Sequence, residues 1–355
     1  MKTLRLIVDP GRLQAGAAAQ ALRQAAGILR AGGLVALPTE TVYGLGANAL
    51  DPAAVARIFA AKQRPGWDPI IVHIAPAATP DAMLRGLVEP AAVNDRVRRL
   101  MQAFWPGPLT LLLPRTSAVP DAITAGRPLV GLRMPAHPVA IELIRLAGLP
   151  IAAPSANLFG HISPTTAAHV LQDLDGRIDA VLDAGPTGYG VESTVLDPNP
   201  DPMIVYRPGA ITAAQIRGLA GPVEVYRETG LPVETPRAPL PSPGVGLRHY
   251  APRARLILVD APLQRLSGEI AAAAAQFPPE TVGVMLPAGL AAPPAIAPQR
   301  VYAWGRWDAP EELARRLYAG LRALDAQGCA VILCPLPPEE GFGAAIRDRL
   351  RKAAR

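Results

Sequence analysis

The segment Leu34-Val-Ala-Leu-Pro-Thr-Glu-Thr-Val-Tyr-Gly-Leu-Gly46 decides how this chain folds. Its apolar first part, Leu34–Pro38, predicts a short buried strand. Thr39–Gly46 is rich in hydroxyls and glycine, which predicts a turn-rich loop leaving that strand. Upstream, the alanine-rich residues 16–32 predict a helix that ends at a glycine C-cap. Helix, buried strand and polar loop in succession are typical of α/β proteins, where ligands bind beyond the strand ends.

The same alternation continues downstream. Asp51 and Pro52 are an N-cap and a first helical residue, so Pro52–Lys62 is predicted to be a helix. The β-branched run Ile70–Ile74 predicts a strand. Further strands are predicted at 109–113, 129–133, 151–153, 180–183, 194–197 and 203–206, with helices near 91–103, 138–147 and 165–174. Because some of these strands follow one another without a helix, the sheet is predicted to be mixed.

The composition changes after residue 220. Residues 221–253 are rich in proline and lack hydrophobic periodicity, which predicts an extended linker. From residue 254 the alternation resumes, with strands at 254–260, 281–286, 300–303 and 329–333 and helices near 262–276, 309–327 and 343–354. This predicts a smaller Rossmann-like α/β domain, without the glycine-rich loop of a dinucleotide site. The predicted domains are therefore 1–220 and 254–355, joined by the linker.

Composition narrows the class of function. The 35 Lys and Arg residues exceed the 29 Asp and Glu residues, and the net charge of +6 suits an anionic ligand such as a nucleotide, or weak contact with RNA. The two cysteines, Cys329 and Cys334, can form neither a disulfide framework nor a four-ligand zinc site, and they are expected to be buried thiols. Without a run of about 18 apolar residues or a signal-peptide core, the chain is predicted to be cytoplasmic and without a membrane partner.

Polar residues gather where the predicted strands and helices end. Each group has a structural explanation, since cations favour helix C-termini and Ser or Asn cap helices. Together they supply hydroxyls, amides and cations, without a catalytic dyad, a metal-binding motif or a phosphate-binding glycine loop. This combination indicates phosphate chemistry by positioning and electrostatic stabilisation. The groups are Lys62-Gln-Arg64, Pro154-Ser-Ala-Asn157, Ser163–Thr166, Gly190–Thr194 and Arg207.

These groups also carry a resemblance. Lys62-x-Arg64 with Ser155-x-Asn157 resembles the motif of the YrdC-like superfamily, and the surrounding segments keep the superfamily's order over residues 15–215. The tail resembles the long, two-domain form of that superfamily, the threonylcarbamoyl-AMP synthases. The segments are Pro38–Gly46, Phe104–Thr110, Arg133–Pro138, Ala153–Asn157 and Gly190–Thr194, followed by Ser242–Gly244, His249–Pro252 and Gly341–Leu350.

The resemblance implies an N-terminal YrdC-like domain with a twisted mixed sheet, and a reaction. L-threonine, bicarbonate and ATP would give L-threonylcarbamoyladenylate and pyrophosphate, for modification of the adenosine next to the tRNA anticodon. It implies catalytic roles for Lys62 and Arg64. It implies ATP contacts from Arg64, Asp68, Ser155, Asn157 and Arg207, and threonine contacts from Thr39, His73, Thr124, Ala153, Ser163 and Ser193. Mg²⁺ would come with ATP, held by phosphate oxygens without protein metal ligands.

Two departures from the family pattern and several alternatives remain. Asp68 stands where the family commonly has asparagine, so either it points at Mg²⁺ or the nucleotide contact at this position is lost. In the linker, the residues Val245–Arg248 differ from those usual in the family. The segment Ser242–Pro252 is expected to close over the site. His73, alone in an apolar strand, is by itself more typical of a core histidine. The alternatives are an RNA-binding module and a carbamoyl-adenylate-forming domain with another acceptor. Transient contact with tRNA or with the downstream transferase complex stays open.

Overall fold

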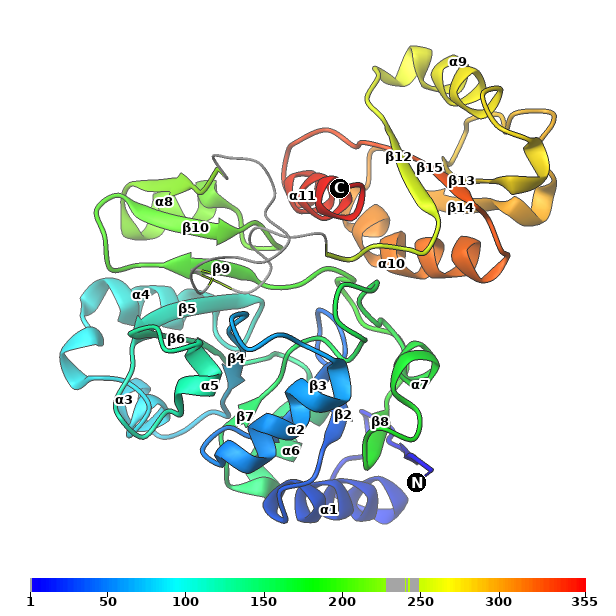
Figure 1. Ribbon diagram of the computed structural model, residues 1–355. Coiled ribbons are helices and arrows are strands. Elements are labelled where there is room, and N and C mark those ends of the chain that lie inside the picture. Colours follow the sequence, from blue (N-terminus) through cyan, green and yellow to red (C-terminus); the bar gives the residue numbers. More distant parts are fainter. Residues whose placement is uncertain (1, 228–239, 241, 243–248) are drawn as a thin grey trace. The chain divides into compact units, whose positions relative to one another are not determined.

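Two units make up the chain in the computed structural model, which describes residues 2–227, 240, 242 and 249–355 (Figure 1). The first unit comprises Met1–Phe159, Pro164–Gly188 and Glu192–Gly246. The second comprises Gly160–Ser163, Tyr189–Val191 and Leu247–Arg355. No helix among the described residues is long and apolar enough to cross a membrane.

The first unit is built on one large sheet. Its strands are β1 (Leu4–Ile7), β2 (Val35–Leu37), β3 (Gly44–Asn48), β4 (Ile71–His73), β5 (Leu109–Pro114), β6 (Leu129–Arg133), β7 (Ile151–Ala152), β8 (Ala180–Asp183), β9 (Thr194–Asp197), β10 (Met203–Arg207) and β11 (Val223–Val225). Within the described residues their order is β1-β8-β2-β3-β7-β4-β6-β5-β9-β10-β11. Parallel and antiparallel pairs occur together, since β2 is parallel to β8 and antiparallel to β3. The predicted mixed sheet is confirmed.

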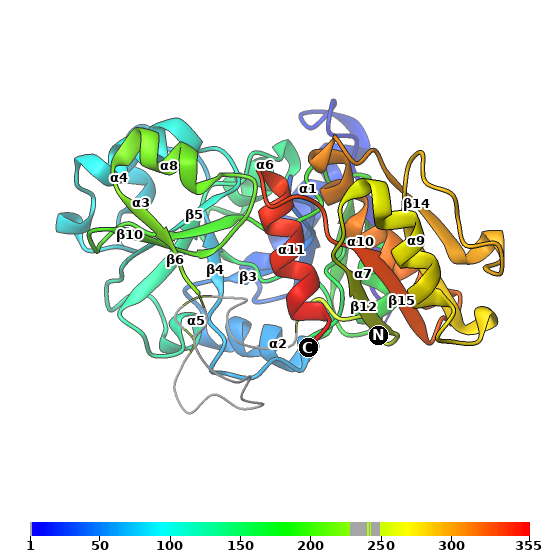
Figure 2. The ribbon, with the colours of Figure 1, turned by 90° about the horizontal axis from the view of Figure 1, so that it is seen from above.

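Helices cover both faces of this sheet. They are α1 (Gly16–Arg30), α2 (Pro52–Lys62), α3 (Pro80–Leu84), α4 (Asp95–Phe104), α5 (Asp121–Thr124), α6 (Pro138–Ala147), α7 (Ala167–Leu174) and α8 (Ala213–Ala220). α1 and α6 lie side by side, as Figure 2 also shows. Val35 and Leu37 share their core, whereas Ala36 joins the core that contains α2, α4, α7 and α8. Alternate side chains of a strand point to opposite faces, so the apolar run that opens the fold is buried on both sides.

The predicted helix ends are confirmed at α1 and α2. The Asp51 carboxylate accepts a hydrogen bond from the Ala53 N–H at 2.9 Å, and Pro52 occupies the first helical position. At the end of α1, Gly32 has φ 78°, the left-handed conformation that glycine adopts at least cost.

The prediction of a loop over Thr39–Gly46 is wrong in its second half. β3 begins at Gly44 and pairs antiparallel with β2, so that Leu37 faces Gly44 and Val35 faces Gly46. A Cβ on Gly46 would lie 2.9 Å from Leu37 Cδ2 and 3.0 Å from Ile151 Cγ2. The glycine therefore marks a close packing contact within a strand, and a glycine-rich pattern alone does not distinguish that from a turn.

Two more strands differ from the prediction. β1 pairs in parallel with β8, and no strand was predicted from the sequence at these residues. β11 lies at the start of the predicted linker and pairs in parallel with β10, with α8 as the connection between them. Its three residues are too few to show a period, so nothing in the pattern distinguished them from the linker. Most of the remaining linker (228–239, 241 and 243–248) lies outside the described residues, as does most of the segment predicted to close over the site.

The second unit has a parallel sheet of four strands within its described residues, in the order β12-β15-β13-β14. They are β12 (Arg255–Val259), β13 (Val282–Pro287), β14 (Val301–Gly305) and β15 (Val331–Pro335), with helices α9 (Leu263–Ala274), α10 (Pro310–Ala326) and α11 (Phe342–Ala353). α9 packs on the face that holds Val331 and Leu333, while α10 packs on β13 and β14 and against α11. The predicted Rossmann-like α/β fold is confirmed. Cys329 and Cys334 are both buried, as expected.

Candidate active site

Lys62 lies at the C-terminal end of α2, where the chain turns sharply. Gln63 has φ 53°, and the N–H groups of Gln63 and Arg64 close the helix by donating to carbonyls of its last turn. Lys62 is 1% exposed, and its Nζ donates to the carbonyl oxygens of Ser155 at 2.6 Å and Asn157 at 2.5 Å. Two of the segments named from the sequence, about ninety residues apart, therefore lie together.

The electrostatics of Lys62 suit an anionic ligand. Burial, and after it the nearby Arg64 guanidinium, hold the pKa of Lys62 well below its usual value, while Asp68 and Asp173 act in the opposite direction. A bound phosphate would favour the charged ammonium, because an opposite charge within a few ångströms stabilises the protonated form. A buried cation with a perturbed pKa is typical of a functional site.

Arg64 lies in the same turn, and the chain that follows holds its side chain in place. Its Nε donates to the Asp68 carbonyl at 3.2 Å, and one terminal nitrogen donates to the Pro69 carbonyl at 2.7 Å. The same nitrogen lies 2.9 Å from the Asp68 carboxylate, and both side chains are almost wholly buried. The Asp68 carboxylate therefore faces the Arg64 guanidinium, a partner that the sequence did not indicate.

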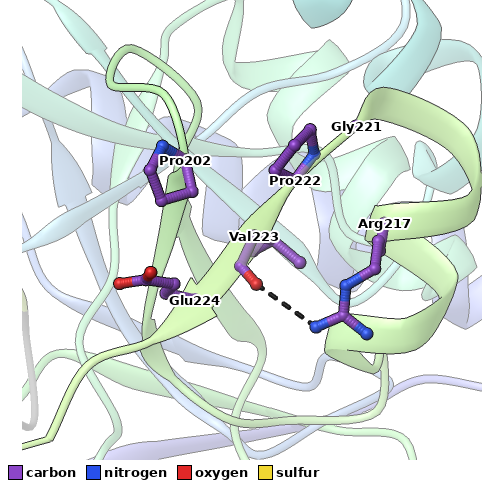
Figure 3. A pocket seen from close by; sticks show the side chains of 6 residues that line it. All are labelled: Pro202, Arg217, Gly221, Pro222, Val223 and Glu224. Carbon is purple, nitrogen blue, oxygen red and sulfur yellow. Dashed lines mark hydrogen bonds between the residues drawn. The ribbon is translucent and has the colours of Figure 1, made fainter.

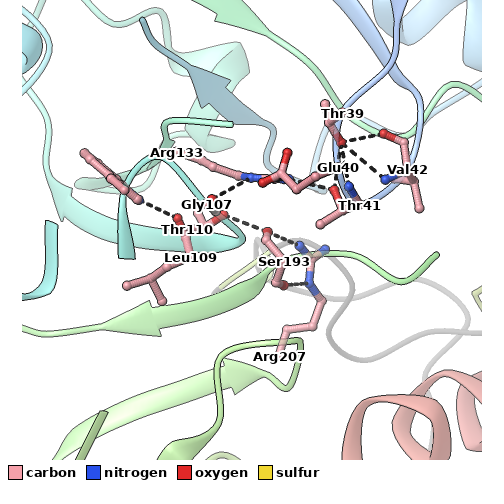
Figure 4. Close-up of polar contacts among 11 residues, drawn as sticks. Thr39, Glu40, Thr41, Val42, Gly107, Leu109, Thr110, Arg133, Ser193 and Arg207 are labelled. Carbon is pink, nitrogen blue, oxygen red and sulfur yellow. Dashed lines mark hydrogen bonds and ion pairs between the residues drawn. The ribbon is translucent and has the colours of Figure 1, made fainter. Parts of the chain in front are cut away.

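Arg207 and Ser193 form a second polar group (Figure 4). Arg207 ends β10 at a bulge against β9, and its guanidinium donates to the carbonyl and the hydroxyl of Ser193, both at 3.0 Å. The Ser193 hydroxyl also lies 2.8 Å from the Thr110 hydroxyl. All three residues are at most 5% exposed. Hydrogen bonds therefore hold one cation and two hydroxyls together at the ends of three strands.

Thr39 belongs to a third polar group in the loop after β2. Its hydroxyl donates to the Val42 carbonyl at 2.7 Å and lies 2.8 Å from the Thr41 hydroxyl. Arg133, the last residue of β6, donates to Thr41 Oγ1 at 2.9 Å and pairs with the Glu40 carboxylate at 2.6 Å. Figure 4 shows this group and the Ser193–Arg207 group on either side of Gly107, whose carbonyl accepts from Arg133 Nε at 3.3 Å.

His73 and Thr124 are polar residues buried in the first unit. His73, on β4, is 3% exposed, and burial followed by the Arg133 charge lowers its pKa to about 3, so the imidazole is neutral. Its Nδ1 and the Thr124 hydroxyl have no hydrogen-bond partner among the described residues. Since buried polar groups are nearly always paired, these two indicate places for a ligand. Ala153 lies beside β4, and its N–H donates to the Ile71 carbonyl at 2.9 Å.

Ser163 is the one predicted site residue outside the first unit. It is fully buried and belongs to the short segment Gly160–Ser163 of the second unit. Its predicted contact with threonine therefore stays a prediction.

Similarity to known proteins identifies the family. Residues 27–209 match a family model described as "Telomere recombination", and residues 211–355 match one described as "Threonylcarbamoyl-AMP synthase, C-terminal domain". The threonylcarbamoyl-AMP synthase of Pyrococcus abyssi is 43% identical over 94% of both chains. That of Bacillus subtilis is 44% identical over 94% of this chain and 92% of its own. This chain belongs to the threonylcarbamoyl-AMP synthase family.

A solved structure supports membership of the threonylcarbamoyl-AMP synthase family over the whole length. The crystal structure described as P. abyssi Sua5 complexed with L-threonine has a TM-score of 0.88 and 42% identity, covering 99% of this chain and 98% of that one. The recognition of the long two-domain form from the sequence is thereby confirmed.

Glu40 and Arg133 are polar residues of this synthase fold to which the sequence assigned no role. Both lie at strand ends, and both belong to segments that carry the family resemblance. Their pairing across about ninety residues has no sequence signal. A charged residue that ends a strongly apolar strand, as Arg133 ends β6, is the feature that could have indicated it.

A cavity elsewhere in the first unit is not part of this site (Figure 3). It has a volume of about 500 Å³ and lies where α8 turns into β11. Its cation, Arg217, donates to the Val223 carbonyl at 3.3 Å. None of the predicted site residues lines it; its walls are Pro202, Arg217, Gly221, Pro222, Val223 and Glu224.

Proposed function

We propose that the chain synthesises L-threonylcarbamoyladenylate from L-threonine, bicarbonate and ATP and releases pyrophosphate. The observation that carries this proposal is the buried Lys62, which lies on the Ser155–Asn157 segment beside a second buried cation, Arg64. Paired buried cations suit a reaction in which the enzyme positions phosphates and stabilises their charge. The family name supplies the substrate.

The chemical step is attack of a carboxylate on a phosphate. The threonine amine and bicarbonate first give threonine carbamate, with loss of water as the C–N bond forms. One oxygen of the new carboxylate then bonds to the α-phosphorus of ATP while the bond from that phosphorus to the bridging oxygen breaks, and pyrophosphate leaves with the electron pair. Negative charge grows on the transferred phosphate and on the leaving group, where fixed cations stabilise it most. Lys62 and Arg64 take this role, and Ser155, Asn157 and Arg207 hold the rest of the nucleotide.

Threonine is held by groups that recognise a small polar amino acid. Thr39, Thr124, Ser163 and Ser193 offer hydroxyls, and Ala153 offers backbone groups. His73 contributes as a neutral imidazole, because its lowered pKa excludes a charged ring at neutral pH. The unpartnered Thr124 hydroxyl and His73 Nδ1 are the atoms we expect the substrate to satisfy.

Mg²⁺ enters with ATP. No group of three or more His, Cys, Asp or Glu side chains that could hold a metal occurs among the described residues. Mg²⁺ retains water and binds substrate phosphates readily, so oxygens of ATP would supply most of its ligands. The reaction belongs in the cytoplasm, where the adenylate would pass to the transferase that modifies tRNA.

The test is threonine-dependent pyrophosphate release. Purified protein with ATP, Mg²⁺, bicarbonate and threonine should release pyrophosphate and form a product with the mass of threonylcarbamoyladenylate. Omission of threonine should abolish most of the release. Turnover that is independent of threonine would favour another acceptor. A salt-sensitive shift of RNA without any ATP turnover would favour the RNA-binding alternative.

A further inference from the structure

The segment Arg64–Asp68 is organised around one ion pair. Arg64 and Asp68 are four residues apart, yet α2 has already ended at Lys62, so no helix brings them together. The segment folds back instead, and the Asp68 N–H donates to the Pro65 carbonyl at 3.3 Å. The Arg64 guanidinium then donates to the carbonyls of Asp68 and Pro69 and pairs with the Asp68 carboxylate.

An aromatic ring completes the surroundings of this guanidinium. Arg64 Cζ lies 6.0 Å from the centre of the Phe159 ring, which also makes an edge contact with Trp67 at 5.8 Å. The Phe159 N–H donates to the Lys62 carbonyl at 2.9 Å, so the ring is tied to the end of α2. The guanidinium is thus held from several directions, and its orientation is set by Asp68 and Pro69 on the chain that follows and by Phe159.

Charge explains why a carboxylate stands at this position. Lys62 and Arg64 are like charges buried side by side, and Arg64 contributes to the low pKa of Lys62. Asp68 is fully buried against Arg64, and its charge opposes the lowering of the Lys62 pKa. An asparagine could accept a hydrogen bond from Arg64, but it could not offset the charge of either cation.

We propose that Asp68 is a positioning residue for Arg64: it aims the guanidinium at the phosphates of ATP through the buried ion pair, and it is not itself a ligand of the nucleotide or of Mg²⁺. This deepens the proposed function and rests on it. The carboxylate already pairs with Arg64, and the described residues around it form no group of metal-binding side chains. Displacement of a guanidinium by about 1 Å lowers the rate of a reaction that depends on alignment. Its effect on the free energy of unfolding is expected to be much smaller.

A double-mutant cycle tests whether Asp68 acts through Arg64. Wild type, Asp68→Asn, Arg64→Ala and the double variant are compared by kcat/KM for ATP and by the Kd of a non-hydrolysable ATP analogue. We expect Asp68→Asn to lower kcat/KM about tenfold in the wild-type background and less than twofold in the Arg64→Ala background. The Mg²⁺ concentration for half-maximal activity should not change. Equal losses in both backgrounds, or a several-fold increase in the Mg²⁺ requirement, would overturn the proposal.

Matched variants keep the result interpretable. Asp179→Asn removes a different carboxylate, which pairs with Arg57 of the same helix α2 at 2.8 Å, and should leave kcat/KM unchanged. If Asp68→Asn does not fold, Asp68→Glu enters the same cycle with the same criterion, since it keeps the charge and displaces the guanidinium. The analogue Kd needs no turnover. A wild type that binds the analogue but forms no adenylate therefore contradicts the proposed function, while the cycle still decides the role of Asp68.

Discussion

Both units of the chain contain buried cationic side chains, but the partners of these side chains differ. In the second unit, the buried cations Arg347, Arg349 and Lys352 all lie on α11. Lys352 pairs with Asp348 at 2.9 Å and Arg349 pairs with it at 2.5 Å, while Arg347 pairs with Asp260 at 2.7 Å. Burial acts to raise the pKa of Asp348, yet the two cations hold it below its usual value.

In the first unit, the buried polar groups come from separate segments, and some of their donor or acceptor atoms have no hydrogen-bond partner among the described residues. Lys62 has carbonyls as hydrogen-bond partners, and its pKa falls, because burial outweighs the nearby carboxylates. His73 Nδ1 and Thr124 Oγ1 have no partner among the described residues. Buried charged side chains therefore occur both on α11 and in the candidate active site. What distinguishes Lys62 from Lys352 is the kind of hydrogen-bond partner: Lys62 donates to backbone carbonyls from another segment, whereas Lys352 donates to the carboxylate of Asp348 on its own helix.

Removal of one buried lysine from each unit gives the largest contrast. Lys62→Ala should lower kcat/KM for ATP about 10²- to 10³-fold, because a charge that stabilises the transition state is lost. Lys352→Ala should leave kcat/KM within about threefold and lower the free energy of unfolding by about 1–3 kcal/mol, since a hydrogen-bonded ion pair is broken. Pyrophosphate release and denaturant unfolding of both variants measure the two effects. Similar kinetic losses in both would end the distinction.

The pH dependence of stability tests whether His73 is held neutral. Its pKa is about 3 in the folded protein and about 6.5 in an unfolded chain, so the unfolded state binds the extra proton. The resulting stability is complete above pH 6.5 and is lost as the pH falls from there toward 3. Wild type should lose about 2 kcal/mol more than His73→Gln between pH 7.5 and pH 5. Equal losses in urea titrations at the two pH values would show that His73 is charged or exposed.

The sequence predicted most strands and helices, because buried apolar runs and helix caps are local signals. Asp51 capping α2 and the alternation across β2 followed from a few adjacent residues. The strand β3 did not follow, because only its neighbours show that Gly46 is a packing contact. Likewise, the sequence named Lys62, Ser155 and Asn157 together. The Lys62 ammonium, however, donates to the backbone carbonyls of the other two residues, and a backbone contact cannot be predicted from side-chain type. The Arg64–Asp68 and Arg133–Glu40 pairs depend on loop paths that lack periodicity.

Two buried threonines of the first unit differ in whether the side-chain hydroxyl has a hydrogen-bond partner. Thr124 Oγ1 lacks a partner among the described residues, whereas Thr194 Oγ1 donates to the Ile211 carbonyl at 2.7 Å and accepts from the Ile211 N–H at 3.1 Å. Thr124→Val should therefore raise the free energy of unfolding by about 1 kcal/mol, and Thr194→Val should lower it by a similar amount. Only Thr124→Val should raise the KM for threonine. A loss of stability in both variants would mean that Thr124 is satisfied within the protein.

The smallest expected effect concerns the turns that end α2 and α10. After α10, the left-handed position is taken by Gly328, at φ 70°, and a Cβ there would contact nothing within 4 Å. After α2 the same conformation is taken by the exposed Gln63. A side chain costs about 1–2 kcal/mol in this conformation, while glycine gives back about 0.5–1 kcal/mol through the entropy of the unfolded chain.

Gln63→Gly should therefore raise the free energy of unfolding by up to about 1 kcal/mol, and Gly328→Ala should lower it by about 1 kcal/mol. Denaturant titrations of the two variants, with Gln63→Val as the strained control, measure both. We expect kcat/KM for ATP to stay within twofold in Gln63→Gly, because the backbone that aims Lys62 and Arg64 keeps its path. A stabilised Gln63→Gly with a large kinetic loss would instead mean that the strained residue itself holds these cations in place.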